Sequence, residues 1–93
     1  MSESRRNNLK ERLTEVLALP KEIVLDLPKI TLTGNSQFVI ENYKGIIEYG
    51  SELIRINTAK GLVKIYGQSL EINTVTNEEI YIAGKIANVE FSS

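Results

Sequence analysis

Apolar and polar side chains alternate through residues 45–67, and this alternation limits the possible fold more than any other feature of the sequence. The alternating apolar positions are Ile47 and Tyr49, Ile54 and Ile56, and Val63 and Ile65. Glycines and small polar residues separate these runs. Such a pattern is typical of half-buried strands joined by turns. It therefore predicts the centre of an antiparallel β-meander.

The clearest turn signal in this stretch is the sequence Thr58-Ala59-Lys60-Gly61. Glycine tolerates a positive φ and suits the left-handed position of a three-residue hairpin loop with a G1 bulge. We therefore expect a hairpin that closes at Gly61, with antiparallel strands on both sides of it.

The same patterning predicts about eight short strands, at residues 30–33, 37–41, 46–49, 53–58, 62–66, 69–74, 79–83 and 86–91. The connections between them are short and rich in Gly and Asn, so we expect strands that are neighbours in sequence to pair in space. The predicted fold is mainly β, in a single domain over residues 1–93, with a helix at 4–19 and a β-meander at 29–91 that rolls on itself. Because the strands recur about every eight residues, a β-solenoid is the alternative, although no motif repeats with that spacing.

The helix prediction depends on an apolar stripe formed by Leu9, Leu13, Val16 and Leu17, which recur at the i, i+4, i+7 and i+8 positions of one helix face. Pro20 ends the pattern. The opposite face carries Arg5, Arg6, Lys10, Glu11, Arg12 and Glu15. A solvated face on a helix that packs against the sheet is the simpler interpretation, and a basic binding face is the alternative.

A short apolar segment, residues 21–27, follows between Pro20 and Pro28. Proline cannot donate a hydrogen bond to a strand ladder and favours extended geometry in the residue before it. We therefore expect an edge strand or an extended connector here. Asp26 lies beside the second proline, so its expected role is local hydrogen bonding in a turn rather than catalysis.

The strands are expected to bury one face of the sheet. The predicted inner face comprises Phe38, Ile40, Ile47, Tyr49, Ile54, Ile56, Val63, Ile65, Leu70, Ile72, Ile80 and Ile82. The second face is charged in places but also carries Val39, Ile46, Leu53, Leu62, Tyr66 and Tyr81. We expect the N-terminal helix to cover part of this second face, and a protein partner or a second copy of the chain is the alternative cover.

Composition removes most catalytic chemistry. The 93 residues include no cysteine and no histidine, which excludes the usual zinc ligands and the Cys-His and Ser-His nucleophile pairs. The carboxylate pairs in the predicted turns suit solvated charges better than a glycosidase site. The net charge of -1 and the lack of a phosphate-binding glycine motif argue against nucleic acid and nucleotides. We expect no enzyme activity, no cofactor and no metal.

The N-terminus is polar, and no apolar run is long enough for a signal sequence or a membrane span. We therefore expect a cytoplasmic protein without a transmembrane segment.

Taken in order, the chain resembles the YabP/YqfC family of bacterial sporulation proteins, and the YqfC branch most closely. The matching segments are LALPKEIVLDLPKITLTG (17–34), FVIENYKGIIEY (38–49), IRINTAKGLVKIYGQSLEI (54–72) and EEIYIAGKIANVEF (78–91). The resemblance implies a small protein of the mother cell in an endospore-forming bacterium, acting at or near the forespore envelope. It supplies no catalytic motif.

We therefore expect a non-enzymatic interaction or assembly module in spore envelope and coat development. The expected partner is a protein at the forespore envelope, including one that is associated with the membrane. Self-association of the chain is left open. The candidate partner-binding residues are Arg5, Arg6, Lys10, Val39, Leu62, Tyr66 and Tyr81. The alternative is a small-molecule or nucleic-acid binding domain that uses the interior of the rolled sheet or the basic helix face.

Overall fold

The computed structural model describes residues 25–93. The predicted helix at 4–19, with Arg5, Arg6 and Lys10, lies outside the described residues, as does most of the segment after Pro20.

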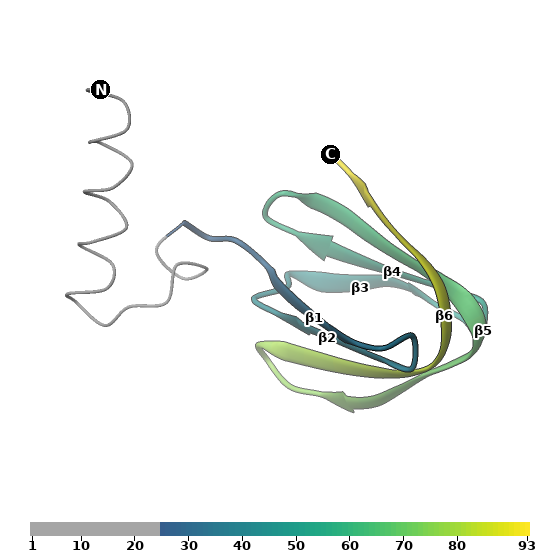
Figure 1. Ribbon diagram of the computed structural model, residues 1–93. Coiled ribbons are helices and arrows are strands. Elements are labelled where there is room, and N and C mark those ends of the chain that lie inside the picture. Colours follow the sequence, from purple (N-terminus) through teal and green to yellow (C-terminus); the bar gives the residue numbers. More distant parts are fainter. Residues whose placement is uncertain (1–24) are drawn as a thin grey trace, which may run out of the picture.

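The described part of the chain is one antiparallel sheet of six strands, which confirms the mainly β prediction (Figure 1). The strands are β1 (Lys29–Thr33), β2 (Gln37–Glu41), β3 (Gly45–Tyr49), β4 (Leu53–Thr58), β5 (Gly61–Val75) and β6 (Glu79–Ser92). Their order in the sheet is β1-β2-β6-β5-β4-β3, so β1 and β3 are the edge strands. The single open antiparallel sheet is not a solenoid.

The prediction of eight strands was wrong because two expected turns are bends within continuous strands. The segments 62–66 and 69–74 both belong to β5, and 79–83 and 86–91 both belong to β6. The pairing of β5 with β6 continues through these bends, with register shifts between Tyr66 and Gly67 and between Gln68 and Glu71. Bulges of this kind bend a strand without ending its ladder.

The prediction that sequence neighbours pair in space was also wrong at one place, because β2 pairs with β6 and not with β3. Only residues 42–44 join β2 to β3, although three strands lie between them in the sheet. In a flat sheet, four strand spacings of about 4.8 Å would separate them by roughly 19 Å. Four Cα–Cα steps of about 3.8 Å reach at most ~15 Å. The sheet must therefore be folded.

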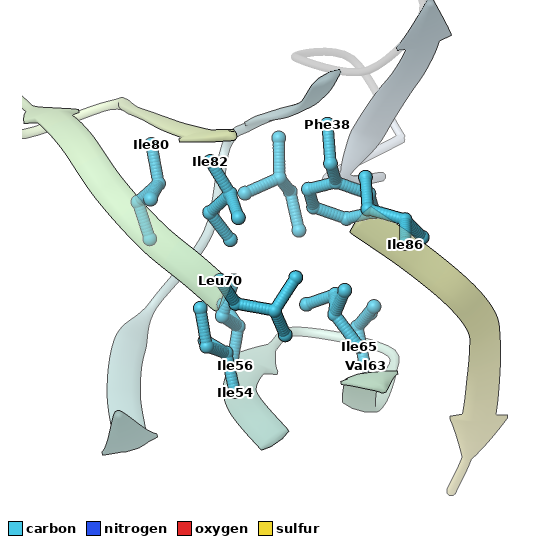
Figure 2. Packing of buried hydrophobic residues seen from close by; sticks show 10 residues of the cluster. Phe38, Ile54, Ile56, Val63, Ile65, Leu70, Ile80, Ile82 and Ile86 are labelled. Atoms are coloured by element: carbon cyan, nitrogen blue, oxygen red, sulfur yellow. The ribbon is translucent and has the colours of Figure 1, made fainter. Parts of the chain in front are cut away.

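The bends in β5 and β6 divide the sheet into two half-sheets. The first half-sheet comprises β1, β2, the N-terminal half of β6 and the C-terminal half of β5, and the second comprises β3, β4, the N-terminal half of β5 and the C-terminal half of β6. Figure 2 shows their buried side chains facing each other, with Phe38, Ile80 and Ile82 opposite Ile54, Ile56 and Ile65.

The core follows directly from the register of the strands. Each half-sheet carries two rows of apolar side chains that run across four paired strands. The rows are Ile30–Ile40–Ile80–Val75, Leu32–Phe38–Ile82–Ile72, Ile46–Ile56–Val63–Phe91 and Tyr49–Ile54–Ile65–Val89. The two central members of every row are buried, and the row ends are half-buried or exposed. The core therefore consists of the central side chains of the four rows, which pack between the two half-sheets. Leu70 and Ile86 complete it at the bends.

Nine of the twelve residues predicted for the inner face are buried, and Ile72 is half-buried against them. Ile47 was wrong, since a bulge between Ile46 and Glu48 on β3 turns Ile46, which was expected on the second face, toward the core row instead. The side chain of Ile47 is 51% exposed. Tyr49 lies on the inner face opposite Ile54, but its side chain is 55% exposed because it stands at the end of its row. Ile86, which is 8% exposed, was missed because the bend of β6 interrupts the alternation.

The bends themselves depend on close approach of two backbones. A Cβ atom on Gly67 would overlap the carbonyl oxygen of Lys85. A Cβ on Gly84, whose φ is +139°, would lie 2.6 Å from the carbonyl oxygen of Ser69. Only glycine lets the two long strands bend together at this place.

The predicted hairpin at Gly61 is present, with a φ of +117° at that glycine. The hydroxyl of the buried Thr58 donates to the carbonyl oxygen of Gly61 at 2.8 Å and accepts from the amide of Lys60 at 3.1 Å. A Cβ at Gly61 would overlap the carbonyl oxygen of Ser92 on the neighbouring strand.

The Gly61→Val variant should therefore lose roughly 1–3 kcal/mol of folding free energy, because a β-branched side chain is strained at positive φ and meets β6. Chemical denaturation measures the loss. The matched control is Gly45→Ala, since a Cβ at Gly45 meets nothing within 4 Å. Equal stability of Gly61→Val and the unchanged chain would contradict the turn assignment.

Candidate interaction surface

The folded sheet divides the apolar residues of the predicted second face between two outer surfaces. Val39 and Tyr81 are cross-strand partners on the first half-sheet. Leu62 and Tyr66 lie on the second half-sheet, on the same side of β5. All four side chains are half-buried. Because the inner faces pack together, the two outer surfaces point away from each other, and the structure does not bring the four residues into one site.

The outer surface of the second half-sheet is crossed by a row of charges, Glu48–Arg55–Lys64–Glu90. Arg55 Nε donates to Glu48 Oε1 at 2.7 Å, and Lys64 Nζ lies 3.8 Å from Glu90 Oε1. The two negative and two positive charges of the row cancel. The surface therefore lacks the unpaired basic stripe with which proteins hold nucleic acid.

Apolar side chains flank this charged row on both sides. Leu53 pairs with Tyr66, and Leu62 pairs with Asn57 on β4 and with Ser92 on β6. Aromatic and aliphatic groups beside self-paired charges suit contact with a protein, because the charges need no partner from the other molecule and the apolar groups gain from losing water. We call Leu53, Leu62 and Tyr66, with the charged row, the outer patch.

The outer surface of the first half-sheet carries the cross-strand pair Val39 and Tyr81. Tyr81 lies between Val39 and Thr74 in the ladder, and its hydroxyl donates to Glu79 Oε2 at 3.0 Å. This hydrogen bond, with the charge of Glu79, raises the pKa of Tyr81 above its ordinary value of 10.0. The phenol is therefore a neutral hydrogen-bonding group at physiological pH and not a nucleophile.

The interior of the folded sheet holds the fully buried row centres. Two hollows open to solvent lie on the surface of the described residues. One lies along the bend, between Tyr66, Gln68 and Lys85, and another lies beside Tyr49 and Ser51. Side chains of the described residues therefore occupy the space that a ligand inside the roll would need, which counts against the form of the small-molecule alternative that uses this interior.

Among residues 25–93, no group of His, Cys, Asp or Glu side chains could hold a metal ion. No helix in the described part of the chain is long and apolar enough to cross a membrane.

Asp26 has a structural role, but its contacts are not the local ones that the sequence predicted. Asn42 Nδ2 donates to Asp26 Oδ1 at 3.2 Å and to the carbonyl oxygen of Leu27 at 3.0 Å, and Lys44 Nζ donates to Asp26 Oδ1 at 3.2 Å. Asp26 and Asn42 both have left-handed backbones, with φ of 54° and 61°. We call Asp26, Asn42 and Lys44 the clasp, since they tie the segment before β1 to the β2–β3 connection.

The alternation did not indicate that several apolar side chains would be exposed, above all Leu32 and Phe91, which are 49% and 68% exposed. Both residues occupy inward-facing positions of the apolar–polar alternation, opposite the buried residues Phe38 and Val63. Their exposure arises from their places at row ends, which depend on strand order and cannot be read from the alternation.

The comparisons with known proteins identify relatives of this chain. The model of the YabP family matches residues 26–93. The chain is 32% identical over 87 residues to a protein of Bacillus subtilis (strain 168) described as uncharacterized protein YqfC, with 94% of each chain covered. These matches confirm the resemblance drawn from the sequence. No solved structure matches the chain.

The clasp makes the stability of the fold sensitive to acid. The hydrogen bond from Asn42, followed by that from Lys44, lowers the pKa of Asp26 from its ordinary value of 3.8. A carboxyl group whose pKa is lower in the folded chain contributes stability that is present above its unfolded pKa and is lost as the pH falls through its folded pKa.

The unchanged protein should therefore be more stable than Asp26→Asn at neutral pH, and this difference should shrink as the pH falls below about 4. Denaturation curves measured across that range give the difference at each pH. In the Lys44→Met variant, the part of the folding stability that depends on ionised Asp26 should be smaller, so its stability should change less over the same pH range. A constant difference between Asp26→Asn and the unchanged protein at every pH would contradict this role of the carboxylate.

Proposed function

The chain belongs to the YabP family, and we propose that it acts in sporulation as a non-enzymatic interaction module in assembly of the spore envelope and coat. In this proposal the protein is made in the mother cell and works in its cytoplasm, at the forespore surface. It recognises a protein partner there, which can itself be associated with the membrane.

The outer patch is the observation that carries the proposal. Its charges pair with one another along Glu48–Arg55–Lys64–Glu90, and its apolar side chains lie beside them on paired strands. Such a surface can exclude water against a second protein without leaving a buried charge unpaired.

The chemistry of the chain supports a binding role over a catalytic one. No histidine or cysteine is present to act as a base or a nucleophile. Tyr81, whose pKa is raised by its hydrogen bond to Glu79, is a weaker acid than an ordinary tyrosine. The basic residues Arg5, Arg6 and Lys10 lie outside the described residues and are proposed as a second contact to the same partner.

The role in sporulation is tested by deleting the gene from an endospore-forming host that has no second member of the family. We expect normal vegetative growth and fewer heat-resistant spores, which heat treatment and plating measure. A normal yield of heat-resistant spores would contradict the proposal.

The binding surface is tested by returning variants to the deletion strain. Leu62→Ser with Tyr66→Ser, and separately Arg5→Glu with Arg6→Glu, should fail to restore spore yield, and each should bind the partner about tenfold more weakly or worse. Thr31→Ala, on the outer surface of the other half-sheet, is the matched control. Thermal unfolding of each purified variant shows whether it is folded, and full rescue by a folded Leu62→Ser/Tyr66→Ser variant would exclude the outer patch.

A further inference from the structure

The sheet has free edges at which a further strand can pair. In the described residues, four edges lack a neighbouring strand, namely β1, β3 and the C-terminal halves of β5 and β6. A free edge presents unpaired N–H and C=O groups, which can form a ladder with another chain. The four edges differ in how far the rest of the fold protects them.

Two of the edges are protected by their geometry. On β3, the bulge at Ile47 interrupts the regular spacing that a new strand needs. On β5, the amide of Leu70 donates to the carbonyl oxygen of Ser51, and the amide of Ile72 donates to the hydroxyl of Tyr49. These bonds occupy donors that another strand would have to use.

The edge of β6 is protected by charge. Its regular pairing with β5 covers residues 88–92, because the register shifts on the N-terminal side of Asn88. A two-fold pair about the centre of that segment would set Glu90 directly opposite Glu90 of a second copy. Like charges directly opposite each other are destabilising.

On β1, the backbone groups of Ile30 and Leu32 point off the free edge. The residues that flank β2 bond toward β6, since the carbonyl oxygen of Ser36 accepts from Gly84 and the amide of Asn42 donates to the residue before β6. Successive residues of an antiparallel strand bond to alternate sides, so the odd-numbered residues of β2 bond to β1. The register pairs them with the odd-numbered residues of β1. Within residues 25–93, the N–H and C=O groups of Ile30 and Leu32 therefore face away from β2, and no strand neighbour meets them.

The sequence of β1, Lys-Ile-Thr-Leu-Thr, is complementary to itself in one antiparallel register. Centred on Thr31, this register places Ile30 opposite Leu32 of a second copy, and Lys29 opposite Thr33. Each Ile30–Leu32 pair then exchanges both of its N–H···O=C bonds, which satisfies the outward groups. The two Lys29 positions are about 14 Å apart along the strands, farther than the Debye length of about 8 Å at physiological salt. Their repulsion is therefore largely screened.

The same register continues the inner face from one copy into the other. Ile30 and Leu32 both lie on that face, opposite Ile40 and Phe38, and the side chain of Leu32 is 49% exposed. In the pair, Leu32 gains Ile30 of the second copy as a cross-strand neighbour. Contact between these apolar side chains adds to the hydrogen bonds.

We propose that two copies of this chain associate through β1, antiparallel and two-fold symmetric about Thr31, so that their sheets become continuous. A two-fold interface uses the same surface on both copies, which is what a self-complementary strand provides. The outer patch lies on the other half-sheet and stays free, so this inference does not depend on the proposed function.

Cysteine cross-linking of the full chain tests the register. The protein has no cysteine, so Thr31→Cys introduces a single thiol. In the proposed pair this position faces its own copy in a non-hydrogen-bonded pair, with Cα atoms about 4.5 Å apart, which a disulfide can bridge. Mild oxidation should therefore give a disulfide-linked dimer. The matched control is Thr33→Cys, on the same strand and face, whose two thiols would lie about 14 Å apart along the strands and should stay unlinked.

Sedimentation equilibrium of the cysteine-free protein tests the association itself. The unchanged chain should dimerise reversibly as its concentration rises. Leu32→Pro removes an outward N–H without touching the β1–β2 ladder, and it should raise the Kd of the dimer about tenfold or more. Leu32→Ala keeps the N–H and should raise the Kd less. Thermal unfolding shows whether each variant is folded.

Amide exchange identifies what covers the edge. The amides of Ile30 and Leu32 should exchange more slowly as the concentration rises, whereas that of Thr31, bonded to β2, should be slow at every concentration. Slow exchange of Ile30 and Leu32 at every concentration would mean that the same chain covers the edge, and it would overturn the proposal. An unchanged chain that stays monomeric, equal cross-linking at positions 31 and 33, or a folded Leu32→Pro dimer of unchanged Kd would each overturn it as well.

Discussion

The fold depends on the close approach of two backbones where β5 and β6 bend. Gly67 lies against the carbonyl of Lys85, and Gly84 lies against that of Ser69. Because neither glycine has a Cβ, both long strands can turn at the same level while remaining paired. The bend places one half-sheet over the other, and only then do the row centres, from Phe38 on β2 to Ile56 on β4, lose all contact with water.

The same bend explains how a small chain obtains a core from a single sheet. One layer of strands has one apolar face, which must be covered by another element. Here one half of the sheet covers the other. The short β2–β3 connection requires this, since it joins strands that a flat sheet would keep too far apart. The self-cover is incomplete, because the row ends remain outside the overlap. Leu32 and Phe91 are two such exposed row ends, whereas the hydroxyls of Tyr43 and Tyr49 form hydrogen bonds that join β3 and the β2–β3 connection to the C-terminal half of β5 and the residue after it.

The sequence predicted the parts of this structure that depend on local pattern. Alternation identified the strands and most core residues, and Gly61 marked a hairpin. Three features depend on long-range geometry and could not be read in this way. The dipeptides Gly67-Gln68 and Gly84-Lys85 have the composition of turns but lie within strands. Strand β3 is an edge strand with a bulge at Ile47. The hydrogen-bond partners of Asp26 lie 16 and 18 residues away in the sequence. Of the candidate site, the pattern placed Leu62 and Tyr66 together correctly, but it could not show that Val39 and Tyr81 lie on the opposite outer surface.

The most direct test of this account is the stability of Gly67→Ala. The added methyl group would overlap the backbone of Lys85, so the bend must open and both half-sheets must lose packing. We predict a loss of roughly 2 kcal/mol or more in chemical denaturation, with faster amide exchange at both Ile40 and Ile56, one in each half-sheet. A Gly67→Ala protein within about 0.5 kcal/mol of the unchanged chain, with amide exchange unaltered in both half-sheets, would contradict it.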